Sequence, residues 1–111
     1  MLNHSVLIGR LVRDPELYET ENGNKVTNIV LAVSRTYKNS EGTYDVDYIP
    51  CVLWKGIAER TVQYCKKGDL VSVKGMLQSH SYDREDGTRA YRIEIVVDKV
   101  TFLSTKTKEA E

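Results

Sequence analysis

The chain has little of what small secreted proteins and membrane proteins depend on. It contains two cysteines and two prolines among 111 residues, and Cys51 and Cys65 have neither metal-site nor redox-motif spacing. No apolar run approaches the ~20 residues that a transmembrane helix needs. The N-terminal residues lack the basic and apolar regions of a signal peptide. We therefore expect a cytoplasmic protein without disulfides and without a membrane partner.

The chain also has no excess of charge of either sign. Sixteen basic and sixteen acidic residues give a formal net charge of zero, whereas nucleic-acid binders are often basic. The charges are unevenly distributed, because acidic residues concentrate in residues 14–21, 41–47 and 109–111. Cations cluster around Arg35 and Lys66. A neutral total is therefore compatible with a basic groove.

Motifs for catalysis and for cofactor binding are absent from the sequence. There is no phosphate-binding loop, no paired-carboxylate site and no nucleophile motif. The two histidines, His4 and His80, lack the neighbours that a metal or catalytic histidine needs. We expect neither enzymatic activity nor a metal or cofactor.

The patterning that is present indicates an all-β domain. Strands are predicted at residues 6–12, 26–34, 47–55, 70–81 and 90–103, and a helix at residues 56–67. Gly68, after two lysines, predicts the helix cap, and Asp86-Gly87 predicts a hairpin turn. Gly9 and Gly75 lie inside strands, where a small sheet has to bend. This order matches a five-stranded Greek-key OB-fold barrel with one helix between the third and fourth strands.

The two-residue period of a strand separates a core face from an outer face. The residues predicted to face the core are Ile29, Leu31, Val33, Ile49, Cys51, Leu53, Val71, Val73, Leu77, Ile93, Ile95 and Val97. Tyr48, Val52 and Trp54 fall on the opposite face of their strand, so two large aromatic side chains need not be buried. Tyr18 and Tyr64 are predicted to be packing residues. Residues 1–104 are expected to form the domain and residues 105–111 a disordered tail.

Aromatic residues stand beside cations at the polar side of these strands. The groups are Tyr37 with Arg35 and Lys38, Tyr48, Trp54 with Lys55, and Tyr82 with Arg84. Bases stack on aromatic rings, and phosphates lie against lysine and arginine, so this composition favours single-stranded nucleic acid. An alternative is that Trp54 is an ordinary core residue and that the cations are ordinary solvated charges.

Several stretches resemble the bacterial and phage single-stranded DNA-binding proteins. They are residues 3–11 (NHSVLIGRL), 14–17 (DPEL), 28–34 (NIVLAVS), 47–54 (DYIPCVLW), 58–59 (AE), 64–68 (YCKKG) and 73–77 (VKGML). The resemblance covers about residues 2–103. It implies sequence-independent binding and protection of single-stranded DNA in replication, recombination and repair. It also implies a homotetramer to which the first strand contributes.

The resemblance assigns roles to particular residues. Base-stacking positions fall on Tyr37, Tyr48, Trp54 and Tyr82, and the candidate phosphate contacts are Arg10, Arg35, Lys38, Lys55, Lys67, Lys74 and Arg84. Cations that family members often have are missing at Pro50, Gln78, His80 and Ser81. We therefore expect stacking to contribute more to binding than charge does.

Other expectations concern the setting of the chain and the alternatives to this function. No counterpart of the family's long acidic-tipped tail precedes Glu111, so the sequence resembles either a short form or a longer protein from which the tail was removed, and this chain does not support recruitment of proteins through a tail. The expected location is the cytoplasm, in association with the nucleoid. Two alternatives stay open: an OB module that binds RNA, and a protein-interaction OB domain whose aromatic face is buried at an interface.

Overall fold

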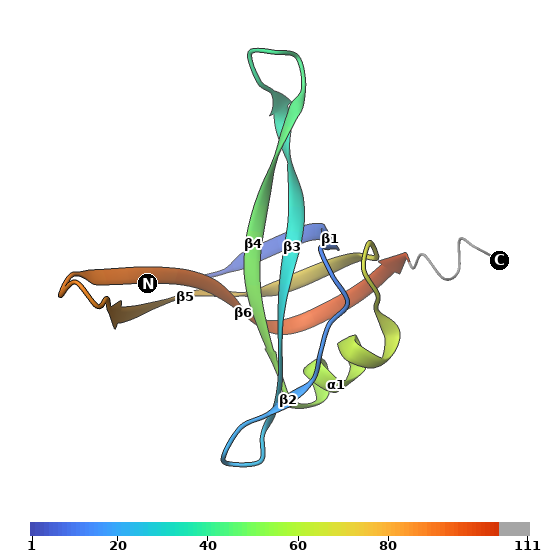
Figure 1. Ribbon diagram of the computed structural model, residues 1–111. Helices are drawn as coiled ribbons and strands as arrows, with labels where there is room; N and C mark the ends of the chain where they lie inside the picture. Colours follow the sequence, from blue (N-terminus) through green and yellow to red (C-terminus); the bar gives the residue numbers. More distant parts are fainter. Residues whose placement is uncertain (105–111) are drawn as a thin grey trace.

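The alternating apolar segments of the sequence form strands, and these strands make one barrel against which a single helix packs (Figure 1). The structure is a computed structural model, and it describes residues 1–104. Along the described chain the elements are β1 (Ser5–Leu11), β2 (Tyr18–Glu19), β3 (Lys25–Lys38), β4 (Tyr44–Trp54), α1 (Lys55–Tyr64), β5 (Leu70–Asp83) and β6 (Arg89–Ser104). The predicted tail at residues 105–111 lies outside the described residues.

The strands close into a barrel because β1 pairs on both of its sides. The sheet order is β1-β5-β6-β4-β3-β2, and Arg10 and Leu11 of β1 also pair with Ala32 and Leu31 of β3. The β4–β6 pair is parallel and the other pairs are antiparallel. The predicted OB-fold barrel is thus confirmed. The two-residue β2 is an added strand, so in this count the helix lies between the fourth and fifth strands.

The core residues come from the predicted inner faces of the strands. Leu31, Leu53 and Val73 are completely buried, and Cys51 is 1% exposed. Burial of this kind stabilises by roughly 1.5–3 kcal/mol for each large aliphatic side chain. Burial also raises the pKa of the Cys51 thiol to about 12, so this free cysteine stays protonated near neutral pH.

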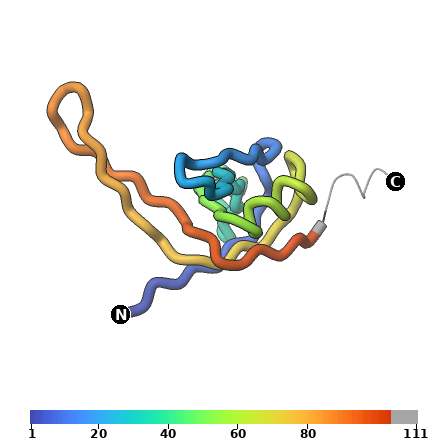
Figure 2. Tube along the Cα trace, turned by 90° about the horizontal axis from the view of Figure 1, so that it is seen from below, coloured from blue at the N-terminus to red at the C-terminus, as the bar shows by residue number. Residues whose placement is uncertain are grey.

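Two long hairpins extend the strands beyond the barrel (Figure 1), and Figure 2 shows the β5–β6 hairpin from below. One is β3–β4, and the other is β5–β6, whose turn contains Gly87 at φ 86° as predicted. Leu77 and Ile93 lie on the β5–β6 hairpin and are 50% and 59% exposed, so their prediction as core residues was wrong. Their alternation continues into an arm that has no opposite sheet to pack against.

The helix is shorter than predicted and ends in a different way. It stops at Tyr64 because Cys65 is extended, at φ −116° and ψ 150°. Gly68 is not the helix cap: at φ 89° it turns the chain so that its N–H donates to the carbonyl oxygen of Leu11 at 2.8 Å. The carboxylate of Asp69 accepts the Lys66 N–H at 2.8 Å and closes the same turn. Tertiary hydrogen bonds to β1 therefore decide where this segment turns.

No helix in the described range has the length and apolar content to span a bilayer.

Two strand glycines, which were predicted to lie where the sheet bends, allow neighbouring backbones to approach closely. A Cβ on Gly9 would lie 2.7 Å from the carbonyl oxygen of Ala32, and a Cβ on Gly75 would overlap the carbonyl oxygen of Val96. The register of β5 against β6 shifts between Lys74 and Gly75, which is where the barrel bends.

We predict that Gly75→Ala destabilises the folded chain by about 1–3 kcal/mol, because the added methyl group overlaps backbone atoms that cannot rotate away. Gly56→Ala is the matched control. Nothing lies within 4 Å of its added Cβ, and helical alanine is more favourable than glycine by up to about 1 kcal/mol. Urea unfolding at equal protein concentration measures both. Equal stability of the two variants would show that the Gly75 approach is unimportant.

Candidate functional site

Aromatic side chains stand on the outer face of β4. Tyr48 is 64% exposed and Trp54 is 39% exposed, and they are six residues apart on the strand, so they share a face. In register, Tyr48 is opposite Ala32 and Trp54 is opposite Val26 on β3. Both aromatic rings are therefore available to a ligand on the outside of the β3–β4 part of the barrel.

An apolar strip beside these rings crosses three strands, β4, β6 and β5. Val52 pairs with Asn28 on β3 and with Val96 on β6, and Val96 pairs with Met76 on β5. Directly paired residues share a face, so this row lies on the same outer face as Trp54. Val52 is only 6% exposed, whereas Met76 is 46% exposed. We call the surface formed by Tyr48, Val52 and Trp54 with their paired neighbours the outer face.

A pocket of about 530 Å³ borders Trp54 where β4 meets the helix. Lys55 and Arg60 line it together with Trp54. Lys55 adopts φ 55°, a left-handed conformation that turns the chain sharply from strand to helix. Arg60 was not among the predicted site residues, because six positions of sequence and a change of element separate it from Trp54. The turn into the helix brings Arg60 into the lining of the same pocket as Trp54.

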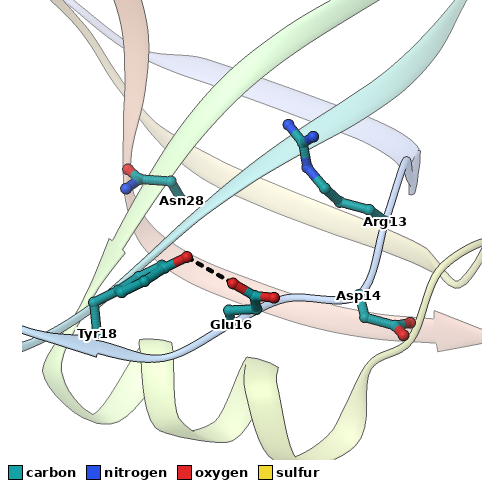
Figure 3. Close-up of a pocket in the computed structure, with 5 residues that line it drawn as sticks. All are labelled: Arg13, Asp14, Glu16, Tyr18 and Asn28. Atoms are coloured by element: carbon teal, nitrogen blue, oxygen red, sulfur yellow. Dashed lines mark hydrogen bonds between the residues drawn. The ribbon is translucent and has the colours of Figure 1, made fainter.

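A second pocket, of about 610 Å³, has residues of β2 and β3 in its lining (Figure 3). It is lined by Arg13, Asp14, Glu16, Tyr18 and Asn28. The hydroxyl of Tyr18 donates to Glu16 Oε2 at 2.6 Å, and this hydrogen bond, with the charge of Glu16, raises the pKa of Tyr18. Tyr18 is 53% exposed, so its prediction as a packing residue was wrong.

Tyr64, the other predicted packing residue, lies away from these pockets. Its ring contacts Phe102, with centroids 5.9 Å apart, yet it is still 56% exposed. It therefore packs along one side only.

The remaining predicted aromatic positions lie on the two hairpins. Tyr37 is 63% exposed near the end of β3, and Tyr82 is 53% exposed near the end of β5. Beside Tyr37, Lys38 Nζ lies 5.9 Å from the ring centroid of Tyr44. Arg84 is in the turn that follows Tyr82, where its N–H donates to the carbonyl oxygen of Thr88 at 2.8 Å. The four predicted rings are thus spread over the barrel and both arms.

The predicted cations differ in how far their charge is compensated. Arg35 donates to both carboxylate oxygens of Asp47, at 3.1 and 2.9 Å, and lies 3.7 Å from Asp45. The hydrogen bond to Arg35 holds the pKa of Asp47 below its ordinary value, and the same pairing raises the pKa of Arg35. Arg35 therefore offers a ligand less uncompensated charge than Lys38 does.

Three further predicted cations lie on or near β1 and β5. Arg10 Nη1 donates to the carbonyl oxygen of Gly68 at 2.9 Å. Lys67 is exposed in the same turn, and its backbone N–H donates to Asp14 Oδ1 at 2.7 Å. Lys74 is exposed on β5, opposite Val6 of β1 and Lys99 of β6. The structure does not bring these cations into either pocket.

His80 has a partner that its sequence neighbours did not reveal. Its Nε2 lies 2.7 Å from Glu94 Oε1 on the facing strand. Among residues 1–104, no group of three or more histidine, cysteine or acidic side chains gathers at one point.

The barrel, its outer aromatic face and its flanking cations are those of an OB-fold module that binds a polymer with flat bases. Comparison with known proteins agrees. Residues 2–103 match the single-strand binding protein family. The chain belongs to the single-strand binding protein family.

Several curated relatives cover almost the whole chain. Single-stranded DNA-binding protein B of Bacillus subtilis is 43% identical over 98% of this chain and 96% of its own length. Single-stranded DNA-binding protein 2 of Staphylococcus aureus is 44% identical over 100% of this chain and 80% of its own. The single-stranded DNA-binding protein of Halalkalibacterium halodurans is 43% identical over 100% of this chain and 66% of its own length. The chain thus spans between about two thirds and nearly all of these relatives.

We predict that Arg35→Gln raises the pKa of Asp47 toward its ordinary value of 3.8, because the largest cause of its lowering is the Arg35 hydrogen bond. In the wild type, the stability that Asp47 contributes is present above its unfolded pKa and is lost as the pH falls through its lowered folded pKa. The variant should lose that contribution. Carboxyl NMR titration measures the shift.

Asp86 is the internal control for this titration. Its pKa is lowered by hydrogen bonds from Thr88, so it should titrate identically in both proteins. An unchanged Asp47 pKa in Arg35→Gln would mean that the ion pair does not persist in solution.

Proposed function

We propose that this chain binds and protects single-stranded DNA, without sequence preference, during replication, recombination and repair. The observation that carries the proposal is Trp54, an exposed indole on the outer face with Lys55 and Arg60 lining the adjoining pocket. This part of an OB barrel is the one that commonly receives oligonucleotides. Membership of a family named for single-strand binding supports the same conclusion, and the chain is a binding protein, not an enzyme.

Stacking explains how such a surface binds any sequence. Every base has a flat face, and stacking on an aromatic side chain contributes roughly 1–3 kcal/mol per base, a magnitude for which this family is itself a reference case. In the proposed mechanism Trp54 and Tyr48 hold bases over the barrel, and Tyr37 and Tyr82 hold bases along the two arms. Duplex DNA binds poorly in this mechanism, because its base faces are hidden inside the stack.

Cations hold the phosphates between the stacked bases. Lys38, Lys55 and Arg84 are exposed beside Tyr37, Trp54 and Tyr82 respectively, and they make the proposed phosphate contacts. Arg35 contributes less, because Asp47 already compensates its charge. Arg10, Lys67 and Lys74 contact the phosphates of a DNA strand that continues around the barrel. Because the cations that family members often have are missing at Pro50, Gln78, His80 and Ser81, stacking supplies the larger share of affinity, and salt sensitivity is modest.

The assembly that we propose is a homotetramer. From Ser5 to Gly9, β1 pairs with β5 on one side only, because its pairing with β3 begins at Arg10. An unpaired strand edge invites pairing with another chain. On the same strand Val6 and Ile8 are 58% and 54% exposed. We infer that β1 contacts β1 of a second copy of the chain. We also propose that the protein is cytoplasmic and associated with the nucleoid, and that residues 1–104 form its domain.

We predict that Trp54→Ala weakens binding of a labelled oligo-dT by roughly 5- to 150-fold, which corresponds to the loss of about 1–3 kcal/mol of stacking. Trp54→Phe should lose less, because it keeps a ring. Fluorescence anisotropy measures affinity, and circular dichroism confirms that both variants are folded. In the wild type, oligo-dT should quench the Trp54 emission and duplex DNA should not.

The same measurements separate the alternatives. Unchanged affinity in a folded Trp54→Ala variant would remove Trp54 from the mechanism. Equal competition by oligo-U would favour an RNA-binding module. Failure of any oligonucleotide to bind would favour a protein-interaction domain.

We predict that Ile8→Glu lowers the assembly to smaller species, since a buried unpaired carboxylate at a subunit contact costs several kcal/mol. Sedimentation velocity measures the mass of wild type and variant. Leu103→Glu is the control, because Leu103 is similarly exposed, at 45%, and lies on β6 away from the open edge of β1. A wild-type protein that sediments at 12.7 kDa would reject the tetramer.

A further inference from the structure

Tyr18 lies in one cross-strand row with Trp54. Tyr18 of β2 is opposite Val26 of β3, and Val26 is opposite Trp54 of β4. Directly paired residues share a face of the sheet, so the Tyr18 ring stands on the outer face. Two strand spacings of ~4.8 Å separate the backbones of Tyr18 and Trp54 by about 10 Å. That distance is about three base rises of a stacked strand, at 3.4 Å each.

One hydrogen bond restrains the Tyr18 ring while leaving it exposed. Its hydroxyl is tied to Glu16 at 2.6 Å, and more than half of the residue remains accessible. A ring that is already fixed loses little conformational entropy when a base stacks on it. Tyr18 thus has the properties of a stacking platform, in addition to its position in line with Trp54.

The other groups of this pocket suit the remaining parts of a nucleotide (Figure 3). Two carboxylates also line the pocket and keep their negative charge, since each accepts a hydrogen bond from a neutral donor: Asp14 Oδ1 from the Lys67 backbone N–H, and Glu16 from the Tyr18 hydroxyl. Arg13 is exposed and forms no ion pair or hydrogen bond with any residue in the described range 1–104. Asn28 is exposed on β3, and its side-chain amide offers both a hydrogen-bond donor and an acceptor.

We propose that the pocket formed by Arg13, Glu16, Tyr18 and Asn28 is an additional nucleotide subsite. A base within about three nucleotides of the one on Trp54 stacks on Tyr18. The amide of Asn28 meets the polar edge of that base, and the Arg13 guanidinium meets its phosphate. This inference rests on the proposed binding of single-stranded DNA and adds a platform to it. The site has about 610 Å³ of space, which is within the range of small-molecule pockets.

The first test compares substitutions at two exposed tyrosines. Tyr18→Ala should weaken oligo-dT binding by roughly 5- to 150-fold, and Tyr18→Phe should stay within about twofold of the wild type, because the ring is what stacks. Tyr64→Ala is the matched control: its ring is 56% exposed but lies against Phe102 outside both pockets. Its affinity should equal that of the wild type. For Arg13→Gln, the slope of log K against log salt should become shallower by about 0.7.

A second measurement needs no variant. Ultraviolet crosslinking of the wild-type protein to oligo-dT that carries 5-iodouracil, followed by peptide mass spectrometry, should yield adducts at both Tyr18 and Trp54. Adducts at Trp54 without any at Tyr18, or equal affinity of Tyr18→Ala and wild type, would overturn the subsite and leave the proposed function intact. Failure of the wild type to bind oligo-dT, with Trp54 unquenched, would overturn both.

Discussion

The closure of the sheet through β1 is the constraint on which the rest of this structure depends. Leu11 pairs with Leu31 on one side while the earlier part of β1 pairs with β5 on the other. The strands can bend far enough for this only where backbones approach closely, and Gly75 against Val96 is such a place. Once the barrel is closed, every strand has an inside and an outside. The outside of β3 and β4 then becomes the surface that a ligand meets.

Strand β4 shows how one sequence serves both sides of the barrel. Cys51 and Leu53 point inward and are buried, while Tyr48 and Trp54 point outward and are exposed. Val52 shares the outer face and is only 6% exposed, whereas Met76 of the same apolar strip is 46% exposed. A surface with exposed rings and an apolar strip binds flat bases better than it binds a bare chain of phosphates. The neutral net charge is consistent with that balance.

The sequence predicted the strands and the helix better than it predicted which of their residues are buried and which hydrogen bonds end them. Alternation identified the strands and most of the core, because the period of two is a property of the strand itself. The same alternation misplaced Leu77 and Ile93, because it continues along the arm after the barrel has ended. It also misplaced Gly68 as a helix cap, since the hydrogen bond to Leu11 that decides its role spans the chain. In both cases the tertiary surroundings decided the outcome: a hydrogen bond to a distant strand for Gly68, and the lack of an opposite sheet for Leu77 and Ile93.

The sequence by itself determined that this chain is a small β-barrel with aromatic residues on the outer face of one strand. Apolar alternation, turn glycines and strand order are local properties, and they are sufficient for that conclusion. Only the tertiary structure decided that Tyr18 lies in line with Trp54, that Arg60 lines the same pocket as that indole and that Asp47 compensates Arg35. These relations depend on the register of strands and on the turn into the helix. Register is set by the packing of the whole barrel, because a slip of one residue would exchange its inner and outer faces.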